Sequence, residues 1–305
     1  MARFLLNRLM ISILVAITVS VVGFSLLRLS GDLATALAGD EATPQEIARV
    51  AHAYGLDKPL YAQYWDWLSN ALHGDLGQSI FNSEPVVTAI SSRVGVTFKL
   101  AVYALILAVA VAIPLGVLAA IRQNTWIDRA ALALAVCGQA LPSFWFALIL
   151  MLVFSVMLRW LPVAGSATEV HFILPTISLS VAVMPQLMRL TRTGMLDVLD
   201  SDFIRTARAK GLSPGRVLFK HALRNAILPV VSLMAVSLGF LIGGSVVVET
   251  IFALNGIGKL AYDSILSQDF PIVQSILIMV SVAYIFLTLV SDVINAWLDP
   301  RIKVG

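Results

Sequence analysis

Residues 100–121 read LAVYALILAVAVAIPLGVLAAI, a run of 22 residues without Asp, Glu, Lys, Arg or His. A bilayer core about 30 Å thick is crossed by roughly 20 apolar residues in a helix that rises about 1.5 Å per residue. Backbone polar groups cannot face lipid unpaired, and a helix pairs them internally. This stretch therefore predicts a transmembrane helix.

Five further charge-free stretches lie along the chain, at 9–27, 130–158, 172–188, 225–248 and 270–291. Together with 100–121 they predict an all-α membrane protein with six transmembrane helices. Kinks are expected at the prolines within them, which are Pro114, Pro142, Pro175, Pro185 and Pro229. Stretch 130–158 is too long for one straight crossing, so we expect it to tilt or to begin as a surface helix before Pro142.

The amino-terminal stretch follows Arg3 and Arg8, as the apolar core of a secretory signal would. Its 19 apolar residues exceed the usual signal core, so a retained transmembrane helix is expected.

Composition excludes several classes of protein. Of the 305 residues, 59% are hydrophobic and 13% are charged, with a mean hydropathy of +0.89, which is unlike a water-soluble enzyme or a disordered chain. The single cysteine excludes a disulfide framework or a thiolate cluster, and the four histidines show no metal-ligand spacing. The sequence Gly256-Ile257-Gly258-Lys259 lacks the remainder of a phosphate-binding loop. We expect no catalytic site, metal or cofactor in this chain, and no nucleic-acid partner.

Charge asymmetry predicts the orientation in the membrane. With a cytoplasmic amino terminus, the inside segments 1–8, 122–129, 189–224 and 292–305 carry 14 Lys and Arg, and the outside segments carry 7. Positive residues favour the cytoplasmic side, so both termini are expected there.

The outer segment 28–99 is predicted to form a small helical cap on the membrane surface. Its aromatic residues recur at helical spacing and are typical of the headgroup level, whereas stacking on a ligand is the alternative function for them. These residues are Tyr61, Tyr64, Trp65 and Trp67.

The inner segment 189–224 predicts a helix, a tight turn and a second helix. Ser201-Asp202 can cap a first helix that Gly211 ends. Ser213 as N-cap and Pro214 as first residue then open a helix toward Ala226. The second helix carries Arg216, Lys220 and Arg224 at i, i+4 and i+8, with apolar Val217, Phe219 and Leu223 elsewhere on its circumference.

This basic, amphipathic pair fits two partners. Anionic lipid headgroups would be attracted to its charge. The small residues Ala207, Ala209 and Gly211 favour a docked protein surface, because small side chains permit close approach.

Polar groups within the apolar stretches either line a cavity or form hydrogen bonds between helices. We predict that the substrate path is lined by Gln139, Ser143, Gln186, Ser237 and Ser245. Those on the third and fifth predicted helices are expected to lie nearest the pore axis. Glu249 and Asp292, at the ends of apolar stretches, are expected at or near the interface. The absence of acids at the midplane argues against an ion-driven secondary transporter, the alternative from another class. A membrane enzyme, the third class considered, would need a nucleophile-base pair or a metal cluster, and the sequence shows neither.

Several motifs, in order over essentially the whole chain, closely resemble the permease subunits of peptide-type ABC importers, the family of dipeptide, oligopeptide, nickel and glutathione transporters. They are YGLDKPLYAQYWDWL (54–68), GDLGQS (74–79), IPLGVLAA (113–120), LPSFWFALIL (141–150), WLPVAG (160–165), RTARAKGLSPGRVLFKHALRNAILP (205–229), GGSVVVETIF (243–252), GIGKL (256–260), DFPIVQ (269–274) and LDPRIK (298–303).

The resemblance implies a type I ABC importer permease fold in the bacterial inner membrane. Residues 1–99 would be the first transmembrane helix with a periplasmic cap loop, and residues 100–305 a five-helix permease core with a cytoplasmic coupling loop at 189–228. The chain would form half of a pore for di- or oligopeptides, with nickel complexes, glutathione or oligosaccharides as alternative cargo. Implied partners are a second homologous permease in a heterodimer, two cytoplasmic ATPase subunits that hold ATP and Mg²⁺, a periplasmic solute-binding protein, and membrane lipid.

The inner loop is similar to the family's EAA loop, which docks on the ATPase subunits. Thr206 and Ala207 take the positions of the motif's two alanines, and Gly211 that of its glycine, whereas Arg205 replaces the usual glutamate. The resemblance thus assigns ATPase coupling to Arg205, Thr206, Ala207, Arg208, Ala209, Lys210, Gly211, Leu212, Ser213 and Pro214.

Overall fold

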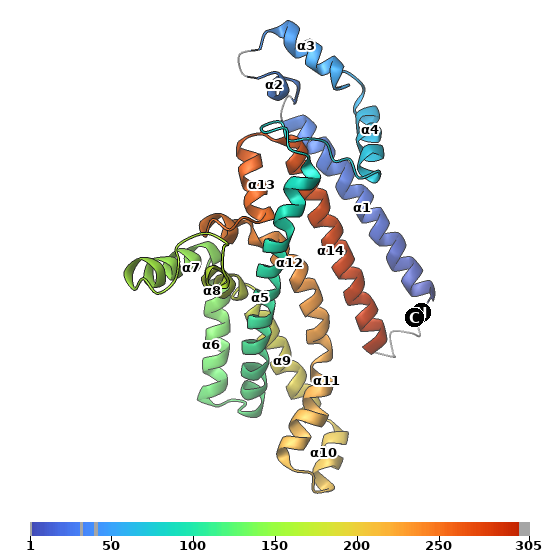
Figure 1. The fold of residues 1–305 in the computed structure, drawn as a ribbon. Coiled ribbons are helices and arrows are strands. Elements are labelled where there is room, and N and C mark those ends of the chain that lie inside the picture. The colour runs from blue at the N-terminus through green and yellow to red at the C-terminus, as the bar shows by residue number, and fades with distance from the viewer. Residues whose placement is uncertain (1, 31–32, 40–41, 299–305) are drawn as a thin grey trace.

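The computed structural model describes residues 2–30, 33–39 and 42–298, and no strand occurs among them. In chain order the helices are α1 (Ala2–Ser30), α2 (Leu33–Ala38), α3 (Pro44–Ala53), α4 (Leu60–Leu72), α5 (Val86–Ile121), α6 (Trp126–Ala140), α7 (Ser143–Leu150), η1 (Met151–Met157), η2 (Glu169–Phe172), α8 (Ile173–Ser180), α9 (Met184–Leu199), α10 (Asp202–Ala209), η3 (Arg216–Leu223), α11 (Arg224–Ala226), α12 (Leu228–Ile251), α13 (Ile257–Leu266) and α14 (Phe270–Leu298) (Figure 1). The part of the carboxyl-terminal segment at 299–305 lies outside the described residues.

Four helices in the described ranges are long and apolar enough to cross a membrane, namely α1, α5, α12 and α14. Two bent pairs, α6 with α7–η1 and η2–α8 with α9, raise the number of possible crossings to six. The prediction of an all-α protein is confirmed, with between four and six candidate spans.

The core lies where α5 packs on α9, α8 and α12. The buried face of α5 consists of small residues, Ala101, Ala104, Ala108 and Ala112, each 0% exposed. Small side chains let neighbouring helices approach closely. Gly116 continues this face, because a Cβ atom there would lie 2.7 Å from the Met188 carbonyl oxygen of α9.

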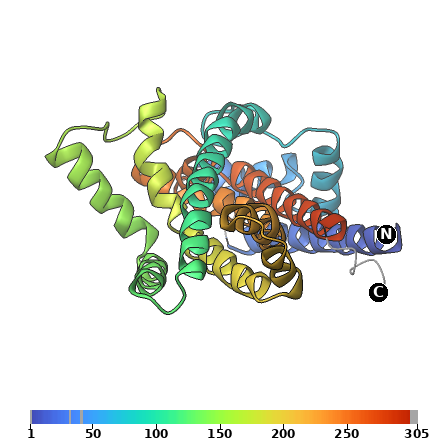
Figure 2. The ribbon, with the colours of Figure 1, turned by 90° about the horizontal axis from the view of Figure 1, so that it is seen from below.

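Two of the apolar stretches bend near their prolines, as expected from the sequence. The axes of α6 and α7–η1 differ by 98° across Leu141-Pro142, so stretch 130–158 does not tilt as one straight helix. Stretch 172–188 likewise bends by 56° before Pro185, which lies in the first turn of α9. Pro114, by contrast, lies within the continuous helix α5. Seen from below, α6 and α7 lie at one side of the bundle and the amino-terminal part of α1 at the other (Figure 2).

The predicted helical cap is formed by α2, α3 and α4 at one end of the bundle (Figure 1). Tyr64 and Trp67 of α4 pack on the Phe24 ring of α1 at centroid distances of 5.4 and 6.0 Å, and the Tyr64 and Ser20 hydroxyls lie 2.6 Å apart. Tyr61 and Trp65 are 78% and 69% exposed. The segment 28–99 is not all cap, because α5 already begins at Val86.

Candidate functional sites: the helix pair and the Glu249 network

The predicted helix pair, formed by α10 and by η3 with α11, lies at the end of the bundle opposite the cap (Figure 1). Helix α10 ends at Ala209, and Gly211 has a φ of +74°, the left-handed conformation that glycine adopts without strain. The Gly211 and Leu212 amides donate to the Arg208 and Ala207 carbonyls at 2.9 and 3.3 Å.

The second helix starts at Pro214, directly after Ser213, and continues through η3 and α11 to Ala226. Both predicted helices and their turn are confirmed. Two details differ. The Ser201 side chain donates to the Val198 carbonyl at 2.5 Å rather than capping α10, and residues 216–223 have π-helical geometry. The first eleven residues of the predicted inner loop, 189–199, belong to α9.

A small apolar cluster fixes the pair to α9. It contains Met195, Ile204, Ala207, Val217, Ala222 and Ala226, all less than 9% exposed. Gly194 of α9 packs so closely that a Cβ atom there would lie 2.8 Å from the Ala226 carbonyl oxygen. Ala207, expected to let a partner approach, is therefore 7% exposed and packs inside the pair. Its small size lets α10 pack against η3 within the pair.

The opposite face of the pair is open. Of the residues assigned to coupling, Leu212 is half-buried and the following are exposed: Arg205, Thr206, Arg208, Ala209, Lys210, Gly211, Ser213 and Pro214. Two aromatic side chains accompany these cations, Phe203 at 47% and Phe219 at 64% exposure. Sequence reasoning missed Phe203, whose signal is a large apolar residue on an otherwise polar face of a short helix.

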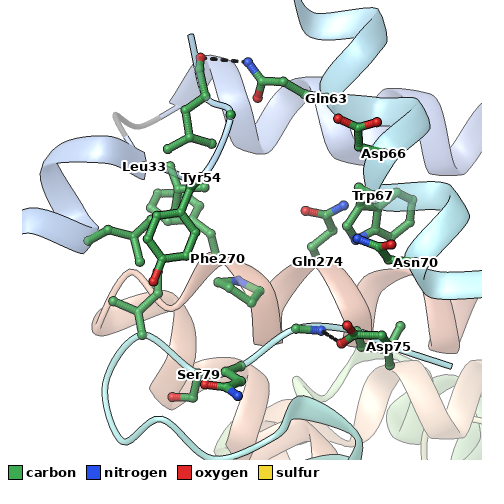
Figure 3. Close-up of a pocket in the computed structure, with 18 of the residues that line it drawn as sticks. Leu33, Tyr54, Gln63, Asp66, Trp67, Asn70, Asp75, Ser79, Phe270 and Gln274 are labelled. Carbon is green, nitrogen blue, oxygen red and sulfur yellow. Dashed lines mark hydrogen bonds between the residues drawn. The ribbon is translucent and has the colours of Figure 1, made fainter. Parts of the chain in front are cut away.

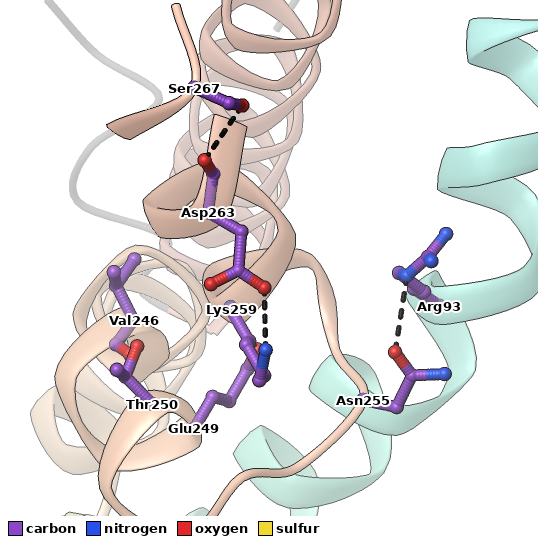
Figure 4. A network of polar contacts seen from close by, with 8 residues as sticks. All are labelled: Arg93, Val246, Glu249, Thr250, Asn255, Lys259, Asp263 and Ser267. Carbon is purple, nitrogen blue, oxygen red and sulfur yellow. Dashed lines mark hydrogen bonds and ion pairs between the residues drawn. The ribbon is translucent and has the colours of Figure 1, made fainter. Parts of the chain in front are cut away.

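A second polar centre surrounds the Glu249 carboxylate near the end of α12 (Figure 4). Glu249 is 0% exposed. Its Oε1 accepts from Thr97 Oγ1 of α5 at 2.8 Å and from Ser245 Oγ at 2.7 Å, and its Oε2 accepts from the Lys259 amide at 3.0 Å. Thr97 Oγ1 also accepts from the Ile257 amide at 2.8 Å.

This carboxylate caps the first turn of α13, where the unpaired amides and the positive end of the helix dipole favour an anion. Gly256 and Gly258 make the approach possible, because Cβ atoms there would lie 2.3 and 2.9 Å from Glu249 Oε2. Protein groups enclose Glu249, and its place at or near the membrane interface stays a prediction. Asp292, by contrast, is half-buried and its carboxylate lies 3.3 Å from Arg8 Nε, which joins α14 to α1.

The segment after α13 is also held by a buried acid. Asp269, 2% exposed, accepts from Ser79 Oγ at 2.5 Å and from the Ile80 amide at 3.3 Å, in the loop before α5. Buried carboxylates thus hold α13 at both ends. Glu249 joins its first turn to α5 and α12, and Asp269, just after its last turn, joins it to the loop before α5.

The five predicted path residues do not form one cluster. Gln139 is exposed near the end of α6, Ser143 begins α7, and Gln186 is exposed near the start of α9. These three lie near the two helix breaks, which adjoin each other because a Cβ atom at Gly138 would contact Val181 and Pro185 at 3.4 and 3.5 Å. Two others lie on α12, where Ser237 is 5% exposed and Ser245 is bound to Glu249.

The described chain is thus a bundle of apolar helices with an exposed basic helix pair at one end. Residues 112–304 match the binding-protein-dependent transport system inner membrane component family, and residues 1–101 match the N-terminal family of the same membrane components. The chain belongs to this family, and it is a permease subunit of a peptide-family ABC importer in the bacterial inner membrane.

Individual proteins agree with this assignment. The chain is 41% identical over 304 residues to the glutathione transport system permease protein GsiC of Escherichia coli strain CFT073 and to that of Salmonella choleraesuis, with 99% of each chain covered. The structure of the MetNI methionine ABC transporter in inward-facing conformations matches with a TM-score of 0.61 at 18% identity, over 71% of this chain and 99% of that chain. This structural likeness supports the fold.

Proposed function

We propose that the chain forms one half of the translocation pore of an ATP-driven importer for short peptides, including the tripeptide glutathione, delivered by a periplasmic solute-binding protein. The observation that carries this proposal is the 41% identity to a glutathione permease over 99% of both chains. Import of nickel complexes or oligosaccharides is the alternative within the family.

In this proposal each bent pair forms one crossing, which gives six spans and places both termini in the cytoplasm. The 14 inside Lys and Arg against 7 outside support this orientation. A second, homologous permease completes the pore, and two cytoplasmic ATPase subunits bind and hydrolyse ATP with Mg²⁺. This chain contributes no catalytic group and no cofactor.

Coupling to the ATPase subunits is assigned to the exposed residues around the 210–214 turn, with Phe203 and Phe219 as apolar contacts. A ligand shifts a conformational equilibrium only through its different affinities for the two states. The ATP-bound and ATP-free ATPase subunits would bind the helix pair with different free energies. The packed cluster of Met195, Ile204 and Val217 would transmit a movement of the pair to α9. Gln139, Ser143 and Gln186 near the helix breaks, with Ser237 and Ser245 on α12, remain the proposed path.

The test is reconstitution of the complete importer in proteoliposomes with its binding protein. We expect glutathione or a dipeptide to stimulate ATP hydrolysis and to accumulate inside the vesicles. Uptake without ATP, driven by an ion gradient, would refute the proposal in favour of a secondary transporter. ATP-dependent uptake of nickel complexes or oligosaccharides alone would change the cargo and keep the mechanism.

A further inference from the structure

A cavity of about 560 Å³ lies between the cap and the first turns of α14 (Figure 3). It is lined by residues of α1, α2, α4, the loop at 75–83 and α14. Its volume is in the range of small-molecule sites, and its lining mixes apolar rings with a few polar groups, as such sites do.

Three buried polar atoms in this lining have no hydrogen-bond partner among the described residues: Arg28 Nη1, Gln63 Oε1 and Gln274 Nε2. Gln274 as a whole is 5% exposed. Buried polar atoms are almost always paired, because an unpaired one has lost its hydration without compensation. Three such atoms around one cavity indicate a ligand that pairs them.

The orientation of Gln63 is fixed by its neighbours. Its Nε2 donates to the Leu56 and Lys58 carbonyl oxygens at 2.9 and 2.8 Å, which leaves Oε1 as an unused acceptor. Asp66, three residues later on α4, lines the same cavity, and both side chains lie at the same end of it in Figure 3. Asp66 Oδ2 accepts from Lys58 Nζ at 2.7 Å, so Oδ1 is the oxygen that remains for a ligand. An acceptor beside a carboxylate suits an ammonium group.

The unpaired donors of Arg28 and Gln274 suit an anionic group. Arg28 is a guanidinium, which binds carboxylates through charge-assisted hydrogen bonds, and Gln274 adds an amide donor. The rings of Trp67 and Tyr54 also line the cavity and present apolar surface. The cavity therefore offers donors for an anion and acceptors for a cation.

We propose that this cavity binds a small zwitterion, an amino acid or short peptide, with its carboxylate at Arg28 and Gln274 and its ammonium at Gln63 Oε1 and Asp66. The site belongs to the cap and is separate from the residues near the helix breaks. It goes beyond the proposed function, because it is a binding site of this chain alone and can be measured without ATP or the other subunits.

The test is equilibrium binding of tritiated glycylglycine to the full chain in phosphatidylcholine nanodiscs. Saturable binding is expected, and blocking either the amino group by acetylation or the carboxyl group by amidation weakens it about tenfold or more, since each removes a charged partner. Blocked peptides that compete as well as the free one would overturn the inference without any mutation. So would the absence of saturable binding.

Two variants test the assigned residues. Arg28→Gln removes the cation and Gln274→Glu places a like charge beside the carboxylate, so each should weaken binding about tenfold or more. Arg122→Gln, at an exposed arginine outside the cavity, is the matched control and should bind as the unmodified chain does. Equal binding by all three would overturn the assignment.

A phospholipid headgroup such as that of phosphatidylethanolamine also carries a phosphate and an ammonium group. Native mass spectrometry of the chain from native membranes distinguishes this source. Retained phosphatidylethanolamine that is lost in Arg28→Gln and not in Arg122→Gln, without peptide binding, would assign the cavity to lipid and refute a solute site.

Discussion

Replacing Glu249 by glutamine tests whether the buried carboxylate holds the first turn of α13. Glutamine keeps the shape and one acceptor oxygen, which can still receive the Thr97 and Ser245 hydroxyl groups. Its NH₂ group would then face the Lys259 amide, which now donates to Glu249 Oε2 at 3.0 Å. The glutamine NH₂ group and the Lys259 backbone N–H are both donors, so the Lys259 amide would lose its hydrogen-bond acceptor.

The magnitude follows from the bond that is lost. A hydrogen bond to a charged group contributes about 1.5–3 kcal/mol. At about 1.4 kcal/mol for each factor of ten, the opening equilibrium of this turn should rise about 10- to 150-fold. Hydrogen exchange measured by mass spectrometry on a peptide covering residues 256–262 should become faster by this factor, while peptides from α5 remain protected.

The matched control lies on the same helix. Asp263 pairs with Lys259 at i,i+4, and its side chain is 53% exposed. Exposed pairs of this kind contribute about 0.3–0.5 kcal/mol, so Asp263→Asn should change exchange by no more than about twofold. If Glu249→Gln and Asp263→Asn gave equal exchange, the carboxylate would not be the cap of α13.

Three further predictions concern other parts of the chain. Gly211→Glu should leave the protein in the membrane and abolish substrate-stimulated ATP hydrolysis of the reconstituted importer, because a bulky acid at a φ of +74° strains the turn by about 1–2 kcal/mol and enters the docking face; unchanged stimulation would contradict the coupling role. Asp128→Asn should lower stability by about 3–5 kcal/mol in a thermal unfolding assay, because Asp128 is 3% exposed and binds Arg192 of α9 through two bonds of 2.6 and 2.8 Å, and an unchanged midpoint would refute this. The start of α3 should open in acid, because the Thr43 amide and hydroxyl groups donate hydrogen bonds to the Glu46 carboxylate and lower its pKa below 4.5. The stabilisation is complete above pH 4.5 and is lost as the pH falls through the lowered pKa. Faster amide exchange at the start of α3 in acid would show this loss, and unchanged exchange would contradict it.

Sequence reasoning located the features that depend on local pattern. Charge-free stretches predicted the apolar helices, and Ser213-Pro214 together with Gly211 predicted the turn of the helix pair, because these residues act on their own backbone. It also predicted breaks at proline without their angles. The 98° bend at Pro142 depends on what packs around it, and Pro114 leaves α5 continuous.

The features that sequence reasoning missed depend on partners distant in the chain. The position of Glu249 at the end of an apolar stretch does not reveal its partner Thr97, which lies 152 residues earlier in the chain. Ala207 is buried within the helix pair, which its small size alone does not reveal. The cavity between the cap and α14 is lined by Arg28, Gln63 and Gln274, whose approach only the fold reveals. Glycines two residues apart at 256 and 258, after an acid, were the available signal for the Glu249 network.

The most direct test of the central claim is gentle purification of the chain from its native membrane, followed by mass spectrometry of everything that accompanies it. We expect to recover a second homologous permease, ATPase subunits and, when substrate is present, a periplasmic solute-binding protein. Recovery of the chain alone, in a form that transports solute without ATP, would contradict it.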